Sequence, residues 1–327
     1  MMDRKMDWIE HFKVDPTEIL ISSKNEALKY FIRRDLLDEK VKPIKTLWEL
    51  SEVEKILRRQ QDNGSWKYPG GNIDIRLPKN YDQLETYRNL GELVGKYGFS
   101  KDHKAIQKAA DFLFQFQSDE GDFRGIYNNQ FSTTYTPAIM ELLIKAGYDN
   151  DSYIIKGFEW LLSIEQNDGG WALPFRTVGK NLKDALNDPV TISPDKSKPF
   201  SHLVTAMVLR AFAAHFQYRK SDKAIKAGKL LISRFFKADK YPDRQDKKFW
   251  ERFSFPFWFT DIVSALDSLY YLGFNVNNPQ INESLEFLRD KQNRKGTFDL
   301  KLVRGQDKDL PYWITLAICR LFKGYYH

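Results

Sequence analysis

The chain has 327 residues, of which 42% are hydrophobic and 15% aromatic, and it carries a formal net charge of +7 at pH 7. This length and apolar content allow one large domain with a substantial core. Because Cys319 is the only cysteine, an intrachain disulfide and a cysteine-rich zinc site are excluded, and because no stretch approaches ~18 consecutive apolar residues, a membrane-spanning helix is excluded as well.

Helices of two kinds alternate along the chain. One kind is amphipathic: Ala105, Ala109 and Phe112 recur at the spacing of a single helical stripe, which predicts an outer helix with one buried face. The other kind is apolar on nearly every side, as in "TPAIMELLIKAGY", which predicts an inner helix buried between several neighbours. In chain order, the outer helices are expected near 47–61, 102–117, 152–166, 222–236 and 280–292, and the inner helices near 24–38, 82–97, 136–146, 201–216, 259–272 and 311–323.

A short motif ends four of the outer helices. In "LLSIEQNDGGW" (161–171) an apolar pair is followed by a Gln, a polar turn with Gly, and an aromatic residue. A fifth stretch, 230–241, keeps the apolar pair and ends in Tyr241 but has lost the Gln and the Gly. The Gln and aromatic positions of the four motifs are Gln61 and Trp66, Gln117 and Phe123, Gln166 and Trp171, and Gln292 and Phe298.

The motif recurs in phase with the helix pairs, so each repeat is an outer helix, a corner and an inner helix. Roughly six inner and five to six outer helices favour closure into an all-α, α/α toroid, although periodicity alone does not separate a closed ring from an open solenoid. We expect residues 1–327 to form a single domain. The long interval 172–200, rich in Pro, Lys and Asp, is expected to be an insertion loop of the kind that forms a lid, a rim or a mobile segment.

The corner resembles the QW motif of squalene and hopene cyclases, whose α/α toroid is shared by the β subunits of protein prenyltransferases. The closest match is "KGFEWLLSIEQNDGGW" (156–171), and the resemblance covers most of residues 45–325. In those families the corner Gln forms hydrogen bonds across the corner and the aromatic residue packs between repeats. The resemblance therefore implies a structural role for the corner residues.

Two chemical hallmarks of these families are missing from the sequence. The cyclases protonate an alkene with an Asp-rich DxDD motif, which does not occur here. The prenyltransferases bind zinc through Asp, Cys and His, but Cys319 lies within the last predicted helix and has no His at metal-ligand spacing. We therefore predict no metal site and no cofactor, and whether the chain is an enzyme stays open.

The resemblance places the candidate site around the N-terminal ends of the inner helices. The matching layer is expected to line a ligand cavity and contains Tyr81, Thr133, Tyr135, His202, Phe257, Trp258, Tyr312 and Trp313. Asp261 and Glu85 are the candidate catalytic carboxylates. Asp261 follows seven aromatic residues within 249–259 and enters an apolar helix, where burial would raise its pKa; it fits equally as a helix N-cap.

Three functions follow from these features. The first is binding of an isoprenoid or other apolar ligand in a central aromatic cavity, with basic rim residues holding a diphosphate or an acidic lipid head: Arg76, Arg124, Arg176, Lys180, Lys248 and Arg252. The second is a divergent terpenoid cyclase that uses Asp261 as its acid. The third is a carbohydrate-active α/α toroid in which Glu85 and Asp261 face each other at ~5–9.5 Å.

The sequence also limits partners and location. The basic charge suits nucleic acid, but no nucleic-acid-binding motif accompanies it, so no specific nucleic-acid partner is predicted. The first residues lack the apolar core of a signal peptide, which favours a cytoplasmic protein. Peripheral contact with a membrane stays open, and nothing indicates a protein partner.

Overall fold

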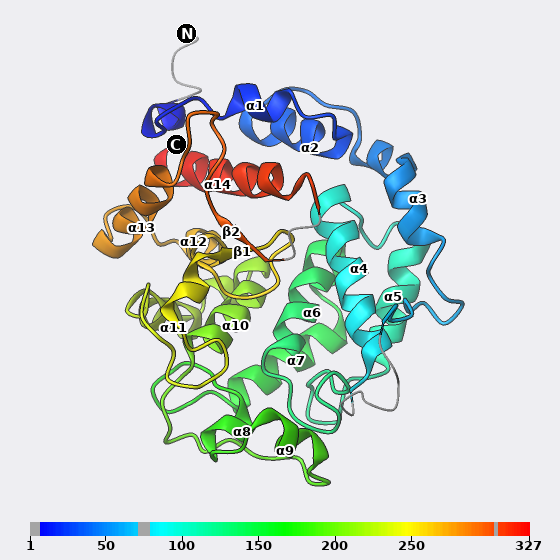
Figure 1. Ribbon diagram of the computed structural model, residues 1–327. Coiled ribbons are helices and arrows are strands. Elements are labelled where there is room, and N and C mark those ends of the chain that lie inside the picture. The colour runs from blue at the N-terminus through cyan, green and yellow to red at the C-terminus, as the bar shows by residue number, and fades with distance from the viewer. Residues whose placement is uncertain (1–6, 71–78, 304–306) are drawn as a thin grey trace.

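Two concentric rings of helices make up most of the computed structural model, which describes residues 7–70, 79–303 and 307–327 (Figure 1). The inner ring contains α2 (Glu26–Phe31), α4 (Tyr81–Tyr97), α6 (Tyr135–Leu143), α10 (His202–Ala214), α12 (Ile262–Tyr271) and α14 (Leu310–Tyr326). The outer helices are α1 (Thr17–Ile21), α3 (Ser51–Leu57), α5 (Lys104–Phe114), α7 (Ser152–Ser163), α11 (Asp222–Ile232) and α13 (Pro279–Asp290). The predicted α/α toroid is confirmed.

The two kinds of helix differ in burial as their sequences predict. On α5, Ile106, Ala109 and Leu113 are fully buried while Lys104 is exposed, so one stripe faces the core. On α10, every residue from His202 to Ala213 is buried. Its first turn is closed by Ser201, whose side chain accepts a hydrogen bond from the backbone N–H of Val204.

The inner helices contact one another in chain order, and the ring then closes. α4 contacts α6, α6 contacts α10, α10 contacts α12, and α12 contacts α14. α14 in turn packs on the π-helical turn Ile32–Leu36 that continues α2, and α2 contacts α4. A closed ring buries both flanks of each inner helix, which is why these segments are apolar on nearly every side.

The corner at 117–123 connects three helices through side-chain and backbone hydrogen bonds. Gln117 Nε2 donates to the carbonyl oxygens of Gly121, within the turn, and Tyr153, at the start of α7, at 2.9 and 2.7 Å. The backbone N–H of Phe123 donates to Thr136 Oγ1 on α6 at 2.9 Å. The corner therefore joins its own outer helix to the next outer helix and to the next inner helix.

The structure corrects the register of two of the predicted corner glutamines. In the first repeat it is Gln60, not Gln61, that donates to Gly64 and to Ala105 at the start of α5, at 2.9 and 2.8 Å. Gln61 turns back to Ser65 Oγ, at 2.7 Å. The side chain that reaches the next outer helix stands six residues before the aromatic one, and Gln61 stands only five before Trp66.

The third corner follows the same rule. Glu165 occupies the position six residues before Trp171, and it pairs with Lys223 Nζ of α11 at 2.6 Å. Gln166 instead donates to the carbonyl oxygens of Asp195 and Lys198, at 2.9 and 3.0 Å. The predicted Gln166 thus fastens the 172–200 insertion, because its side chain faces that loop rather than the next outer helix.

This difference predicts unequal effects of two neighbouring substitutions. Gln60→Ala removes two hydrogen bonds to backbone carbonyls and is expected to lower the free energy of unfolding by about 1–2 kcal/mol. Gln61→Ala removes one contact within the turn and is expected to cost about half as much or less. Urea unfolding of both variants at pH 7 checks the register, and a larger loss for Gln61→Ala would contradict it.

The last corner closes the ring onto the N-terminal segment. Gln292 Oε1 accepts hydrogen bonds from the backbone N–H groups of Lys13 and Val14, at 2.8 and 3.1 Å. Gln292 Nε2 donates to the Val14 carbonyl at 2.7 Å. These residues precede α1, so α1 holds the position that α5 and α7 hold for the earlier corners.

The 172–200 interval is fastened to the toroid rather than extended from it. It contains α8 (Pro174–Thr177) and α9 (Leu182–Asn187). Amide side chains of the preceding turn hold its far end: Asn128, Asn129 and Gln130 donate to the carbonyl oxygens of Leu186, Pro189 and Val190 at 2.9, 2.8 and 2.9 Å. These contacts give the insertion the form of an ordered rim.

Two further features bear on the site. Short strands β1 (Arg252–Phe253) and β2 (Lys301–Leu302) pair in parallel, which brings the aromatic-rich 249–259 stretch beside the segment that precedes α14. Among the described residues, no helix combines the length and the apolar character that crossing a bilayer would require.

Candidate functional site

A short segment crosses the inside of the inner ring and divides it into two cavities. This lumen segment comprises residues 254–258, and Phe255, Pro256 and Phe257 border both cavities. Phe255 stacks on Trp313 of α14 with ring centroids 5.4 Å apart. A Cβ added to Gly95 of α4 would lie 2.9 Å from Pro256, so the helix admits the segment at that position only without a side chain.

The aromatic cavity lies on one side of the lumen segment and has a volume of about 390 Å³. Its walls are largely apolar and include Tyr87, Leu142, Trp258, Val303 and Leu310. The carboxylates that line it pair with two cations: Glu85 lies 3.2 Å from Arg88, while Glu92 and Asp307 lie 2.9 and 2.8 Å from Lys96. An apolar cavity with a few placed charges is the usual form of a small-molecule site.

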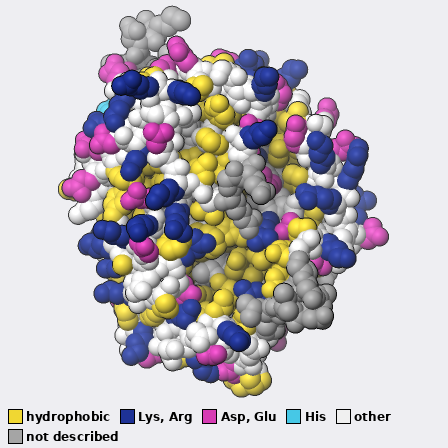
Figure 2. Space-filling view, in the orientation of Figure 1, with side chains coloured by type: hydrophobic (Ala, Val, Ile, Leu, Met, Phe, Trp, Pro, Cys, Tyr) yellow, Lys and Arg dark blue, Asp and Glu magenta, His cyan; other side chains and the backbone are white. Residues whose placement is uncertain are grey.

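Aromatic rings extend from this cavity toward the surface. The Tyr87 ring meets Trp258 and Tyr135 with centroid separations of 5.3 and 5.8 Å. The Arg88 guanidinium lies 4.7 Å from the Trp258 ring centroid, which is cation–π geometry. Figure 2 shows apolar side chains gathered in a hollow at the centre of this face, with lysine and arginine side chains around it.

The structure brings some of the predicted cavity residues together and separates others. Trp258 and Phe257 line the aromatic cavity, Tyr135 packs against its wall through Tyr87, and Trp313 supports the lumen segment. Tyr81 extends the aromatic surface outward, with its ring 5.0 Å from that of Tyr68. Tyr312 is half-buried against the core.

Thr133 and His202 lie in structural contacts instead. Thr133 is fully buried and donates to the Ala172 carbonyl at 3.1 Å. His202 Nδ1 lies 3.1 Å from Asp239 Oδ2, and its ring stacks on Trp250 at 4.7 Å. Burial lowers the pKa of His202 to about 4, so the ring is neutral at pH 7 and fastens the degenerate 230–241 corner to α10.

Asp261 is the N-cap of α12. Its Oδ1 accepts a hydrogen bond from the Ser264 N–H at 2.8 Å, and its own N–H donates to Ser264 Oγ at 3.0 Å, which is a reciprocal capping box. The residue is 1% exposed and borders neither cavity. Because burial is only partly offset by these contacts, the pKa of Asp261 rises to about 7.

That raised pKa predicts a pH-dependent stability. Between pH 4 and 7 the folded state binds the Asp261 proton more tightly than the unfolded state, so the free energy of unfolding falls as pH rises through this window. Asp261→Asn keeps an N-cap and removes the titration. The free energy of unfolding of the variant, relative to that of the wild type, is expected to rise by at least about 1 kcal/mol as the pH is raised from 4.5 to 8. Urea unfolding at the two pH values measures this difference. If the stabilities of the two proteins changed equally with pH, the raised pKa of Asp261 would be contradicted.

The two candidate carboxylates do not share a cavity. Glu85 lines the aromatic cavity, where Arg88 Nη1 lies 3.2 Å from its Oε2 and Asn89 Nδ2 lies 3.2 Å from its Oε1. Asp261 lies outside both cavities, in its capping box. A glycosidase pair needs two carboxylates that face one substrate bond, so this geometry does not favour the carbohydrate alternative.

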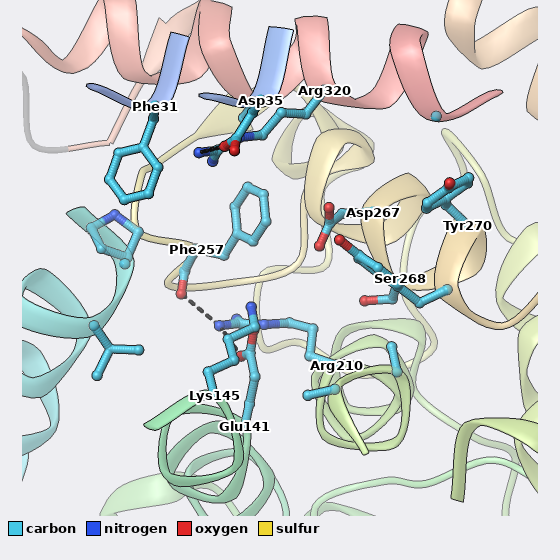
Figure 3. A pocket seen from close by; sticks show the side chains of 18 of the residues that line it. Phe31, Asp35, Glu141, Lys145, Arg210, Phe257, Asp267, Ser268, Tyr270 and Arg320 are labelled. Atoms are coloured by element: carbon cyan, nitrogen blue, oxygen red, sulfur yellow. Dashed lines mark hydrogen bonds and ion pairs between the residues drawn. The ribbon is translucent and has the colours of Figure 1, made fainter. Parts of the chain in front are cut away.

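The charged chamber, on the other side of the lumen segment, has a volume of about 860 Å³ and was not foreseen from the sequence (Figure 3). Its walls come from the C-terminal halves of the inner helices. At its base, Glu141 of α6 pairs with Lys145 at 2.7 Å and with Arg210 of α10 at 2.5 Å. Arg210 also donates to the Phe257 carbonyl at 2.8 Å, which ties the chamber to the lumen segment.

The predicted basic rim is largely neutralised by carboxylates. Arg176 pairs with Asp243 at 2.5 Å, Arg124 with Asp122 at 3.2 Å, and Lys180 with Asp188. Lys248 lies 3.7 Å from Asp246. Arg252 borders a shallow basic opening together with Arg244 and Lys301. Arg76 lies outside the described residues.

No cluster of three or more His, Cys, Asp or Glu side chains within the described ranges has the geometry of a metal site. Cys319 is buried and free.

Comparison with known proteins gives one match by sequence. Residues 83–193 match the family model of the squalene-hopene cyclase C-terminal domain, which confirms the resemblance over about a third of the chain. This stretch contains α4 and α6, which supply one wall of the aromatic cavity. Among curated proteins, no sequence matches.

Solved structures match the chain at low identity. A variant of the type II terpene cyclase MstE from Scytonema, bound to its substrate geranylgeranyl dihydroxybenzoate, is 12% identical with a TM-score of 0.47, and the match covers 86% of this chain and 85% of that one. A protein from Actinoplanes is 14% identical, with a TM-score of 0.44 over 98% and 90% of the two chains. A polysaccharide lyase is 12% identical, with a TM-score of 0.46 over 94% and 96%. These scores support no conclusion about activity.

Proposed function

We propose that this chain, whose residues 83–193 match the squalene-hopene cyclase C-terminal domain, binds an isoprenoid or similar apolar chain in the aromatic cavity. The observation that carries the proposal is the cavity itself: about 390 Å³, bordered by Tyr87, Phe257 and Trp258. Burial of an apolar chain there is favourable by roughly 25 cal/mol per Å² removed from water. The aromatic rings offer large flat surfaces against which an apolar chain can pack.

The charges of the cavity support binding more than catalysis. Glu85, Glu92 and Asp307 each pair with Arg88 or Lys96, so every one of these carboxylates already has a cationic partner. Asp261, the other candidate acid, is engaged in a capping box outside the cavity. The proposal therefore concerns a binding toroid, and the cyclase alternative depends on an acid that the aromatic cavity does not present.

Titration with three probes tests the proposal. We expect farnesol and farnesyl diphosphate to quench tryptophan fluorescence saturably and to remain bound in native mass spectra, and inorganic diphosphate to do neither. Trp258→Ala should weaken farnesol binding by at least about tenfold, because an aromatic anchor in a binding pocket carries a large share of the affinity.

A matched control separates loss of the site from loss of the fold. Trp48 is also half-buried, but it packs on Phe99 with a centroid separation of 4.9 Å and does not border the aromatic cavity. Trp48→Ala should leave farnesol binding within about twofold of the wild type. Absence of binding by either isoprenoid, or equal weakening by both substitutions, would refute the proposal.

A further inference from the structure

The charged chamber contains more positive than negative side chains. Six cations border it, Arg34, Lys145, Arg210, Arg219, Arg320 and Lys323, against four carboxylates, Asp35, Asp38, Glu141 and Asp267. Two of the carboxylates are shared between cations: Glu141 serves Lys145 and Arg210, and Asp35 lies 2.5 Å from both Arg34 and Arg320. Sharing leaves each of these cations with less than one counter-charge.

Arg210 is the most buried of these six cations. Its side chain is 4% exposed, and its Nε and Nη1 groups have no hydrogen-bond acceptor among the described residues. Figure 3 shows its guanidinium beside Glu141 and Lys145, on the side of the chamber away from Asp35 and Arg320. Burying N–H donors without an acceptor is unfavourable, so a ligand oxygen that reached them would be bound favourably.

The neighbouring inner helix, α12, offers a carboxylate. Asp267 of α12 has no ion-pair partner among the described residues, and it lies within electrostatic range of Lys145 and Arg320. Tyr270 and Tyr271 flank it toward the mouth and are 39% and 49% exposed. A carboxylate beside exposed aromatic rings accepts hydrogen bonds from hydroxyl groups and lets a ring or polyol lie against the tyrosines.

We propose that the charged chamber binds a small hydroxylated oxyanion, such as a sugar phosphate or a sugar acid. The phosphate or carboxylate group lies toward Lys145 and Arg210, and the hydroxyl groups lie toward Asp267. The lumen segment separates this site from the aromatic cavity, and the two differ in chemistry. The proposal of an oxyanion site is therefore independent of the proposal of isoprenoid binding.

Thermal unfolding with four probes tests the site. Glucose 6-phosphate, gluconate, inorganic phosphate and glucose are each added to the full chain at 10 mM. We expect a rise in Tm of at least about 2 °C with glucose 6-phosphate or gluconate. Inorganic phosphate should give a smaller rise and glucose none. The first two probes distinguish a phosphate from a carboxylate headgroup.

Variants assign any shift to the chamber. Lys145, with 43% of its side chain exposed, tolerates Lys145→Gln better than the buried Arg210 would tolerate replacement, and Arg219→Gln at the mouth is a second probe. Each should weaken binding about tenfold, whereas Lys229→Gln on the outer helix α11 should not change it. No shift with any probe, equal shifts with phosphate and glucose 6-phosphate, or equal binding by Lys145→Gln and Lys229→Gln would overturn the proposal.

Discussion

Replacing Glu141 with alanine is expected to lower the free energy of unfolding by about 3–5 kcal/mol, the range for breaking a buried ion pair from one side. Glu141 is 2% exposed and lies between Lys145 and Arg210. Lys145 can reach solvent, but Arg210 is left with its charge buried and without its carboxylate partner, although it still donates to the Phe257 carbonyl. Urea unfolding followed by circular dichroism at pH 7 measures the loss.

A double variant separates the pair from the penalty of an orphaned charge. Glu141→Met combined with Arg210→Met replaces both partners with apolar side chains of similar length, and it is expected to unfold with a smaller loss than Glu141→Ala. The exposed pair formed by Glu54 and Arg58 on α3 is the control, since Glu54→Ala should change stability by no more than about 0.5 kcal/mol. If Glu141→Ala destabilised the protein no more than Glu54→Ala does, the predicted role of Glu141 would be contradicted.

Trp171→Ala is expected to be comparably damaging, with a loss of about 3–5 kcal/mol. The Trp171 ring is fully buried against Phe212, its indole N–H donates to the Leu161 carbonyl at 2.7 Å, and its backbone N–H donates to Thr205 Oγ1 at 2.9 Å. Removing the ring leaves a cavity at the junction of α7 and α10, together with an unpaired carbonyl at the end of α7.

Trp171→Phe provides the matched comparison. It keeps most of the ring volume and loses the indole hydrogen bond, so we expect a loss of about 1–2 kcal/mol. Both variants are measured by urea unfolding on the same day and buffer as the wild type. If alanine cost no more than phenylalanine, packing of the ring between repeats would not be what this corner contributes.

The architecture could be predicted because it is repeated along the chain. The stripe of Ala105, Ala109 and Phe112 and its counterparts separate outer from inner helices, and the corner aromatics recur in phase with them. Closure was not readable from periodicity. It depends on contacts between distant parts of the chain, namely α14 with the turn that continues α2 and Gln292 with Lys13 and Val14, which periodicity does not reveal.

Register at the corners was harder because adjacent residues have similar chemistry. Gln60 and Gln61 are neighbours, and only the spacing to Trp66 shows which one faces α5. A count of six residues, as between Gln117 and Phe123, would have selected Gln60 and pointed to Glu165 in the third repeat. The residue types of the motif do not show on which side of the turn each side chain lies.

The charged chamber was missed for a different reason. Glu141, Arg210 and Asp267 each stand alone in an apolar helix, far apart in the sequence, and their meeting depends on how the three helices are rotated about their axes. Periodicity gives the buried face of a helix but not its exact angle to a neighbour.

One signal was available for Asp261: a Ser three residues later is the pattern of a capping box.

The closing contact has a consequence for how this protein is made. Gln292 accepts a hydrogen bond from a backbone amide 279 positions earlier, so a nascent chain leaving the ribosome holds α1 without this partner until the corner that follows α13 has been synthesised. Contacts this distant form late and slow the search for the native state. Repeats in the middle of the chain can pair as they emerge, whereas α1 can make this contact only after α13 and its corner have been synthesised.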